Sequence, residues 1–230
     1  MKNSSQNSHQ IGIVGSFQEL VSHVFNHKTN ALCWERKLHG DFSEIINKMK
    51  FNGNIKEVDL NELRGLELSP QGQLARKTLL QDMQLLTDHG ALPVLNLIKS
   101  YDKDDFFLPT DVYSYHVDRS PIPTSTFLCT YHGASSDILP NEQAEQKITI
   151  PEIRNKLMNM YDGPENGFES FLSEYFFDLH YQAKSNAQPI NLGIGHLWRL
   201  AVDHPESTSL PCIHRAPIEK AGETRLLLIC

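Results

Sequence analysis

Residues 126–131 have the sequence Thr126-Phe-Leu-Cys-Thr-Tyr131, and they follow a segment that contains Tyr113, Tyr115 and Val117. Aromatic and β-branched side chains favour strands because they pack well on a pleated surface. Prolines between residues 109 and 123 separate these segments, as loops between strands would. The sequence therefore predicts that a β structure begins near residue 96.

On the N-terminal side of this stretch, residues 1–95 are expected to be the mainly helical part of the same domain. Asp41 with Glu44 has the spacing of a capping box at a helix start. Ser69-Pro70 predicts a second helix start, with serine as the N-cap and proline in the first turn. Gly90 then marks the expected end of that helix.

On the C-terminal side, residues 140–188 are expected to form a helical insertion with helices near 153–160 and 168–179. The second helix carries an aromatic stripe, which usually belongs to a core; a lid over a pocket is the less common alternative. Strand-like sequence returns at 190–200, 212–213 and 224–229. This order predicts an α+β protein in which helices pack outside a β-barrel or sandwich over residues 96–230.

Composition limits the function classes. Hydrophobic residues make up 40% of the 230 residues, so a core can form, and the net charge of -7 without a long basic run argues against a nucleic-acid partner. No stretch has the roughly 20 apolar residues of a spanning helix, and residues 1–10 form a polar tail with no secretory signal. We therefore expect a cytoplasmic protein whose four widely spaced cysteines stay reduced.

A possible metal site begins with His116-Val-Asp118. In a strand, residues two apart point to the same face, so the imidazole and the carboxylate converge. His214 is the best candidate for a third ligand, and two histidines with one carboxylate form the facial triad of non-haem Fe(II) oxygenases. The motif alone is weak, because with eleven histidines in the chain a surface His near an Asp arises by chance.

Arg225 adds to this motif because it lies in the apolar segment Thr224-Arg-Leu-Leu-Leu-Ile229. A buried guanidinium needs an anionic or hydrogen-bonded partner, and a carboxylate fits its fork. The alternative is a solvent-exposed arginine on an edge strand, or one paired with Glu223.

Several motifs together resemble the bacterial family catalogued as domain of unknown function 1826. The likeness extends in patches over residues 30–229, including Asn30-Ala-Leu-Cys-Trp34, Leu128-Cys-Thr-Tyr131-His-Gly133 and His214-Arg-Ala-Pro217. The family pattern looks like a distant branch of cupin-type oxygenases, which implies a double-stranded β-helix (cupin- or jelly-roll-like) barrel. The chain departs from the family pattern at Thr126, where arginine is usual, and after Tyr131.

The oxygenase resemblance implies that His116, Asp118 and His214 bind Fe(II) and that Arg225 holds the distal carboxylate of 2-oxoglutarate. Thr130 and Tyr131 are further cosubstrate candidates, although they alternate faces and only one of them can point inward.

The substrate would be a small molecule or a protein side chain. The rival hypothesis is a non-catalytic zinc-binding cupin in metal homeostasis, and a third is a decayed site on a barrel that only mediates protein contacts.

Overall fold

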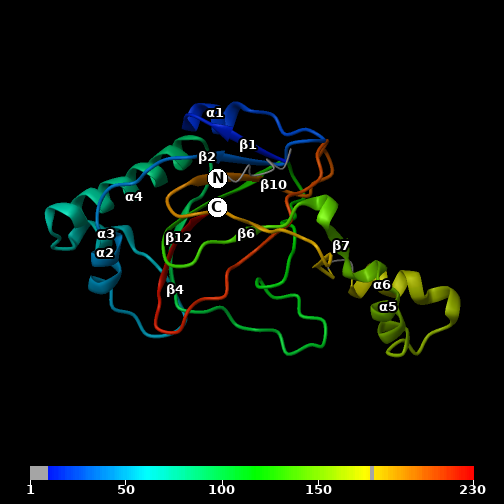
Figure 1. The fold of residues 1–230 in the computed structure, drawn as a ribbon. Coiled ribbons are helices and arrows are strands. Elements are labelled where there is room, and N and C mark those ends of the chain that lie inside the picture. Colours follow the sequence, from blue (N-terminus) through cyan, green and yellow to red (C-terminus); the bar gives the residue numbers. More distant parts are fainter. Residues whose placement is uncertain (1–9, 177–178) are drawn as a thin grey trace.

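The computed structural model describes residues 10–176 and 179–230. The polar tail expected over residues 1–10 therefore lies, apart from Gln10, outside the described residues, as does part of the aromatic stripe expected over 168–179. Within the described ranges the chain has a mixed α+β fold, as the sequence predicts (Figure 1). None of the described helices combines the length and the apolar character needed to cross a bilayer.

The centre of the molecule is a seven-stranded sheet in which neighbours run antiparallel, except for its first two strands, which run parallel. Its strands in spatial order are β1 (Ile11–Val14), β2 (Ala31–Trp34), β10 (Leu197–Ala201), β5 (Ser125–His132), β12 (Arg225–Ile229), β4 (Val94–Ile98) and β3 (Ile55–Glu57). β5 is buried almost throughout because it is a central strand covered on both faces. Its continuous run of strand formers reflects that position.

Two smaller sheets complete the β structure. One contains β11 (His214–Arg215), β6 (Asp137–Ile138) and β9 (Ile190–Asn191), and the other pairs β7 (Ala144–Gln146) with β8 (Tyr181–Ala183). Isolated bridges join the His116 segment to both, because His116 pairs with His214 and Tyr115 pairs with Tyr181. The sheets of the described residues do not close into a barrel.

The helices lie at two ends of the molecule, except for the first, which lies beside the edge of the large sheet (Figure 1). The helices are α1 (Phe17–Ser22), α2 (Phe42–Lys48), α3 (Leu60–Gly65), α4 (Pro70–Asp88), α5 (Pro151–Met158) and α6 (Phe168–Tyr175), with 3₁₀ turns η1 (Asn141–Gln143), η2 (Lys147–Thr149) and η3 (Glu165–Gly167). The predicted N-caps are confirmed: Asp41 accepts from the backbone of Glu44, and Ser69 accepts from Gly72. The Glu44 side chain bonds Ser69 instead of returning to Asp41, so it joins two helix starts.

The large sheet separates two hydrophobic cores. One face packs against α2 and α4, and its core includes Phe127, Cys129 and Tyr131 of β5. The other face packs against the small β11-β6-β9 sheet, and Leu128 lies in that core. Successive residues of β5 therefore point into different environments, and its inner face is the one between the two sheets.

Residues 1–95 were predicted to be mainly helical, but they also contain β1, β2 and β3, which extend the large sheet at both edges. The expected insertion is present, and α5 and α6 bury a separate core with Leu157, Phe168 and Leu172. In Figure 1 this pair projects from the side of the molecule opposite α2, α3 and α4. The aromatic stripe mainly supports that local core, in line with the more common interpretation of such a stripe.

Candidate metal centre

The structure brings His116, Asp118 and His214 together. Each offers one ligand atom, and these atoms all lie within 4.8 Å of one another. The Nε2 atom of His214 lies 3.6 Å from Oδ2 of Asp118, and the two imidazole centroids are 4.6 Å apart. The cause is local pairing: His116 and His214 exchange two backbone hydrogen bonds of 2.9 Å, which places their side chains side by side.

Backbone carbonyls orient both imidazoles. Nδ1 of His116 lies 2.8 Å from the carbonyl oxygen of Ser114, and Nδ1 of His214 lies 3.2 Å from that of Cys212. A carbonyl only accepts, so each Nδ1 carries the proton and each Nε2 keeps its lone pair. This is the tautomer that a metal-binding histidine needs.

Thr126 fixes the third ligand. Its hydroxyl donates a short hydrogen bond to Oδ2 of Asp118. Such a bond restrains the carboxylate and leaves Oδ1 without this restraint. The sequence reasoning treated Thr126 only as a departure from a family pattern, and it missed this contact because the partner lies on another segment.

Burial favours the neutral imidazole of His214. Burial lowers the pKa of His214, and the neighbouring His116 lowers it further, while Asp118 opposes the shift. Burial also raises the pKa of the Cys212 thiol, which keeps it protonated in the inter-sheet core. Cys212 is therefore a packing residue, and its contribution to the site is its carbonyl.

A third histidine was missed as a neighbour of the site. The ring of His180 lies 5.2 Å from that of His116, and its Nδ1 makes a short hydrogen bond with the Ser114 hydroxyl. Burial, followed by His116, lowers the pKa of His180 to about 4. The helix α6 ends at Tyr175, and His180 directly precedes β8.

Arg225 lies in the interior of the large sheet, between β5 and β4, and is 1% exposed. Its guanidinium donates to the hydroxyls of Thr130 at 3.0 Å and Ser136 at 2.8 Å, and its Nε has no partner in the described part of the chain. Burial lowers its pKa, while Tyr101 and Glu219 oppose the shift. The alternatives of an exposed arginine or a Glu223 pair are therefore wrong, because β12 is a central strand.

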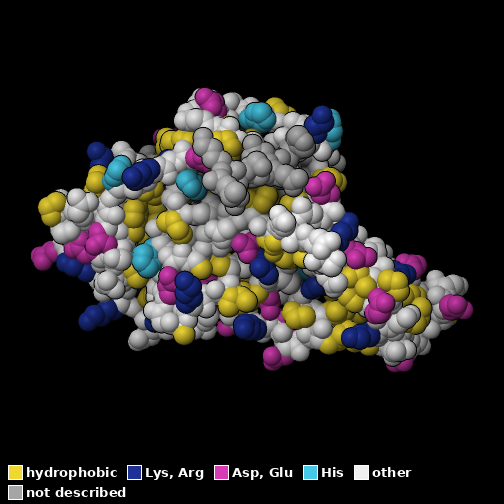
Figure 2. All heavy atoms as spheres, in the orientation of Figure 1, with side chains coloured by type: hydrophobic (Ala, Val, Ile, Leu, Met, Phe, Trp, Pro, Cys, Tyr) yellow, Lys and Arg dark blue, Asp and Glu magenta, His cyan; other side chains and the backbone are white. Residues whose placement is uncertain are grey.

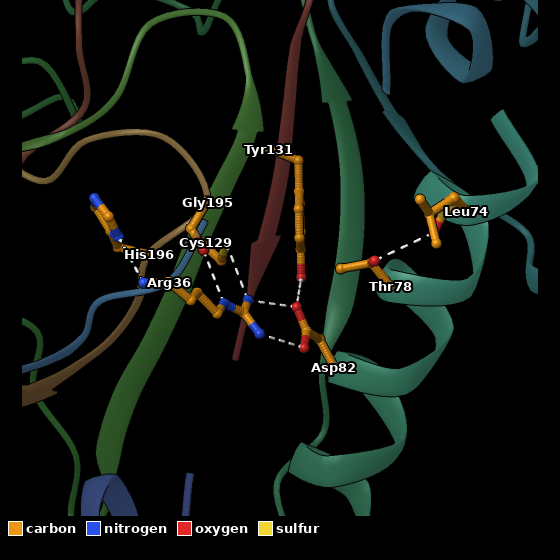
Figure 3. Close-up of polar contacts among 8 residues, drawn as sticks. All are labelled: Arg36, Leu74, Thr78, Asp82, Cys129, Tyr131, Gly195 and His196. Atoms are coloured by element: carbon orange, nitrogen blue, oxygen red, sulfur yellow. Dashed lines mark hydrogen bonds and ion pairs between the residues drawn. The ribbon is translucent and has the colours of Figure 1, made fainter. Parts of the chain in front are cut away.

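The prediction that Tyr131 contacts a cosubstrate beside Arg225 is wrong. Tyr131 points to the helix-facing side of β5, where its hydroxyl donates to Oδ2 of Asp82 at 2.5 Å (Figure 3). Asp82 also receives two bonds from Arg36, of 2.6 and 2.5 Å. Alternation along the strand places Thr130 on the inner face instead.

Two other histidines, His196 and His132, lie away from the candidate ligands. Nδ1 of His196 accepts from the backbone of Arg36 at 3.2 Å, on the side of the Asp82 network (Figure 3). Nδ1 of His132 contacts the carbonyl of Thr224 at 3.1 Å at the end of β5. Neither belongs to the group of ligand atoms around Asp118.

The candidate ligands and Arg225 are both contacted by the same face of β5. Thr126, which holds Asp118, and Thr130, which holds Arg225, both lie on the inner face of β5. Thr126 and Thr130 are four residues apart, or about 13 Å along the strand, and Leu128 lies between them in the inter-sheet core.

Comparison with protein-family models, with curated proteins and with solved structures gave no match. The resemblance to domain of unknown function 1826 therefore stays a prediction.

Proposed function

We propose that this protein is a non-haem Fe(II)/2-oxoglutarate-dependent oxygenase. The observation that carries the proposal is the buried Arg225, whose Nε has no partner among the described residues and whose partner Thr130 lies on the same face of β5 as Thr126, the partner of Asp118. A charged guanidinium whose hydrogen bonds go to neutral hydroxyls is costly to bury even with the Glu219 carboxylate nearby, and an anionic ligand would offset that cost. A metal carrier without such a ligand has no use for the charge.

The strand order supports a double-stranded β-helix. Numbered 1 to 8 along the chain, the strands are β4, the His116 segment, β5, β6, β9, β10, β11 and β12. The central strands of the large sheet then have the order 1-8-3-6, and the small sheet has the order 2-7-4-5. This exchange of strands between two facing sheets is the interleaved Greek-key pattern of jelly rolls.

The ligand set fits Fe(II). Two neutral imidazoles and one carboxylate on one face leave the remaining octahedral positions for a cosubstrate and dioxygen. When bound, the iron would supply the activation of dioxygen, with 2-oxoglutarate as the electron donor. The net reaction would convert a substrate C–H, dioxygen and 2-oxoglutarate into an alcohol, succinate and carbon dioxide.

The residues of the chain have separate tasks in this reaction. Three groups orient the candidate ligands: the carbonyls of Ser114 and Cys212 and the hydroxyl of Thr126. This reduces the reorganisation needed when the metal binds. Arg225, positioned by Thr130 and Ser136, would pair with the distal carboxylate of 2-oxoglutarate. The dry inter-sheet core around Leu128 would exclude water from the bound cosubstrate.

We expect the substrate to be a small molecule or a protein side chain, in a cytoplasmic setting. The acidic net charge disfavours nucleic acid as a partner. Figure 2 supports this expectation for the face it shows, where basic and acidic side chains are interspersed and form no single basic patch.

The test is calorimetric titration of 2-oxoglutarate into the anaerobic Fe(II)-loaded protein. We expect one equivalent to bind to the wild type. Arg225→Lys should bind it with reduced affinity. Arg225→Met should bind it at least about tenfold more weakly, because a charged hydrogen bond is lost. The exposed His27→Ala variant is the matched control and should bind like the wild type. Absence of binding to a metal-loaded wild type would overturn the proposal.

The rival function is zinc binding without catalysis, and one observation favours it. Structural zinc sites have four protein ligands, and His180 lies beside His116 as a possible fourth. Under this hypothesis Arg225→Met would leave zinc affinity unchanged and no 2-oxoglutarate would bind. A protein that binds neither metal would support the third hypothesis, a decayed site that only mediates protein contacts.

A further inference from the structure

The helical insertion carries His180 back to the metal centre through a defined strand register. Tyr181 pairs with Tyr115 in an antiparallel bridge, and its backbone N–H donates to the carbonyl of Tyr115 at 2.7 Å. In that register the neighbour of Tyr181, His180, lies opposite His116. On its other side His116 pairs with His214, so three histidines lie in a row across adjacent segments.

Residues directly opposite each other on paired strands project to the same face. The ring contacts agree with this arrangement, since the His116 centroid lies 4.6 Å from that of His214 and 5.2 Å from that of His180. The outer two side chains are similarly buried, at 8% exposure for His180 and 7% for His214. His180 is therefore buried beside the candidate ligands His116 and His214.

Ser114 orients two of these rings at once. Its carbonyl holds Nδ1 of His116 and its hydroxyl holds Nδ1 of His180. The planes of the two rings are inclined by only 31°. Ser114 therefore occupies Nδ1 of both rings, and Nε2 is the nitrogen of His180 that this contact leaves available to a metal.

We propose that His180 is a fourth metal-ligating residue, whose Nε2 joins the ion held by His116, Asp118 and His214 until a cosubstrate displaces it. This inference rests on the proposed metal centre. His180 lies outside the group whose ligand atoms are within 4.8 Å of one another, so its ring must turn toward the ion. It leaves when 2-oxoglutarate arrives, because a six-coordinate ion cannot keep four protein ligands, bind the cosubstrate through two oxygens and still accept dioxygen.

Cobalt(II) is the probe for this inference, because its visible bands are strong in four-coordinate sites and weak in six-coordinate sites. We expect the wild type to give strong bands that weaken when 2-oxoglutarate is added. His180→Ala should give weak bands from the start and bind cobalt more than about 100-fold less tightly. By comparison, loss of a residue that only hydrogen-bonds a metal ligand reduces metal affinity by about 10–100-fold.

The controls separate the possible failures. His180→Gln tests the same point with a larger side chain if the alanine variant melts earlier, and His196→Ala removes a histidine on the other side of β5. Wild-type bands and affinity in both His180 variants would overturn the inference while the three-ligand site stands. If the wild type binds no cobalt, or if His116→Ala binds cobalt as tightly as the wild type, the metal centre itself is refuted instead.

Discussion

Replacement of Thr126 by valine should weaken metal binding without disturbing the fold. Valine keeps the shape and the β preference of threonine but removes the hydroxyl that donates to Asp118. A hydrogen bond to a charged group contributes about 1.5–3 kcal/mol, and Thr126 is buried, so solvent cannot replace it fully. Because 1.4 kcal/mol corresponds to a factor of about 10, the expected loss of affinity is about 10–100-fold.

The assay is competition between the protein and a chromophoric chelator for Zn²⁺ or Co²⁺ at fixed pH. Ser125→Ala is the matched control, since Ser125 is the preceding residue and its hydroxyl bonds Arg199 instead of a candidate ligand. The control should keep wild-type affinity. Equal affinities for Thr126→Val and the wild type, or equal losses in both variants, would refute the reasoning that the hydroxyl orients the carboxylate.

Three further predictions concern stability. Asp82→Ala should lower the free energy of unfolding by about 3–5 kcal/mol in urea denaturation, because it leaves the buried Arg36 guanidinium without its carboxylate; a loss below 1 kcal/mol would show that water replaces the pair. Gly133→Ala should cost about 1–3 kcal/mol, because φ is +83° and the new Cβ would meet Cα of Arg225 at 2.9 Å; an unchanged thermal midpoint would contradict this. The pKa of His180 is lowered to about 4, so as the pH falls below about 6.5 the unfolded chain takes up a proton at His180 before the folded protein does. The free energy of unfolding should therefore fall by about 1 kcal/mol between pH 7 and pH 5, after allowance for screening. His180→Gln should show a smaller fall.

Two of the three candidate ligands were predictable because strand periodicity acts locally. His116 and Asp118 are two residues apart, and alternation alone places them on one face. The same rule predicted that only one of Thr130 and Tyr131 points inward, but it could not say which. That choice depends on the helix α4, which places Asp82 against the outer face of β5.

Other features depend on pairings between distant segments. His180 reaches the site only because Tyr181 pairs with Tyr115, and no local pattern announces that register. The strands β1 and β2 were not predicted because short apolar runs such as Ala31-Leu-Cys-Trp34 fit a strand and a buried helix equally well. Helix starts at Asp41 and Ser69 were predictable because caps are formed by residues three apart.

The measurement that tests the central claim most directly is the visible spectrum of metal-free protein mixed with Fe(II) and 2-oxoglutarate without oxygen. We predict a weak charge-transfer band from the chelate, absent in His116→Ala and weakened in Arg225→Met. Iron binding to the wild type without that band, or a band of unchanged strength in His116→Ala, would contradict the account.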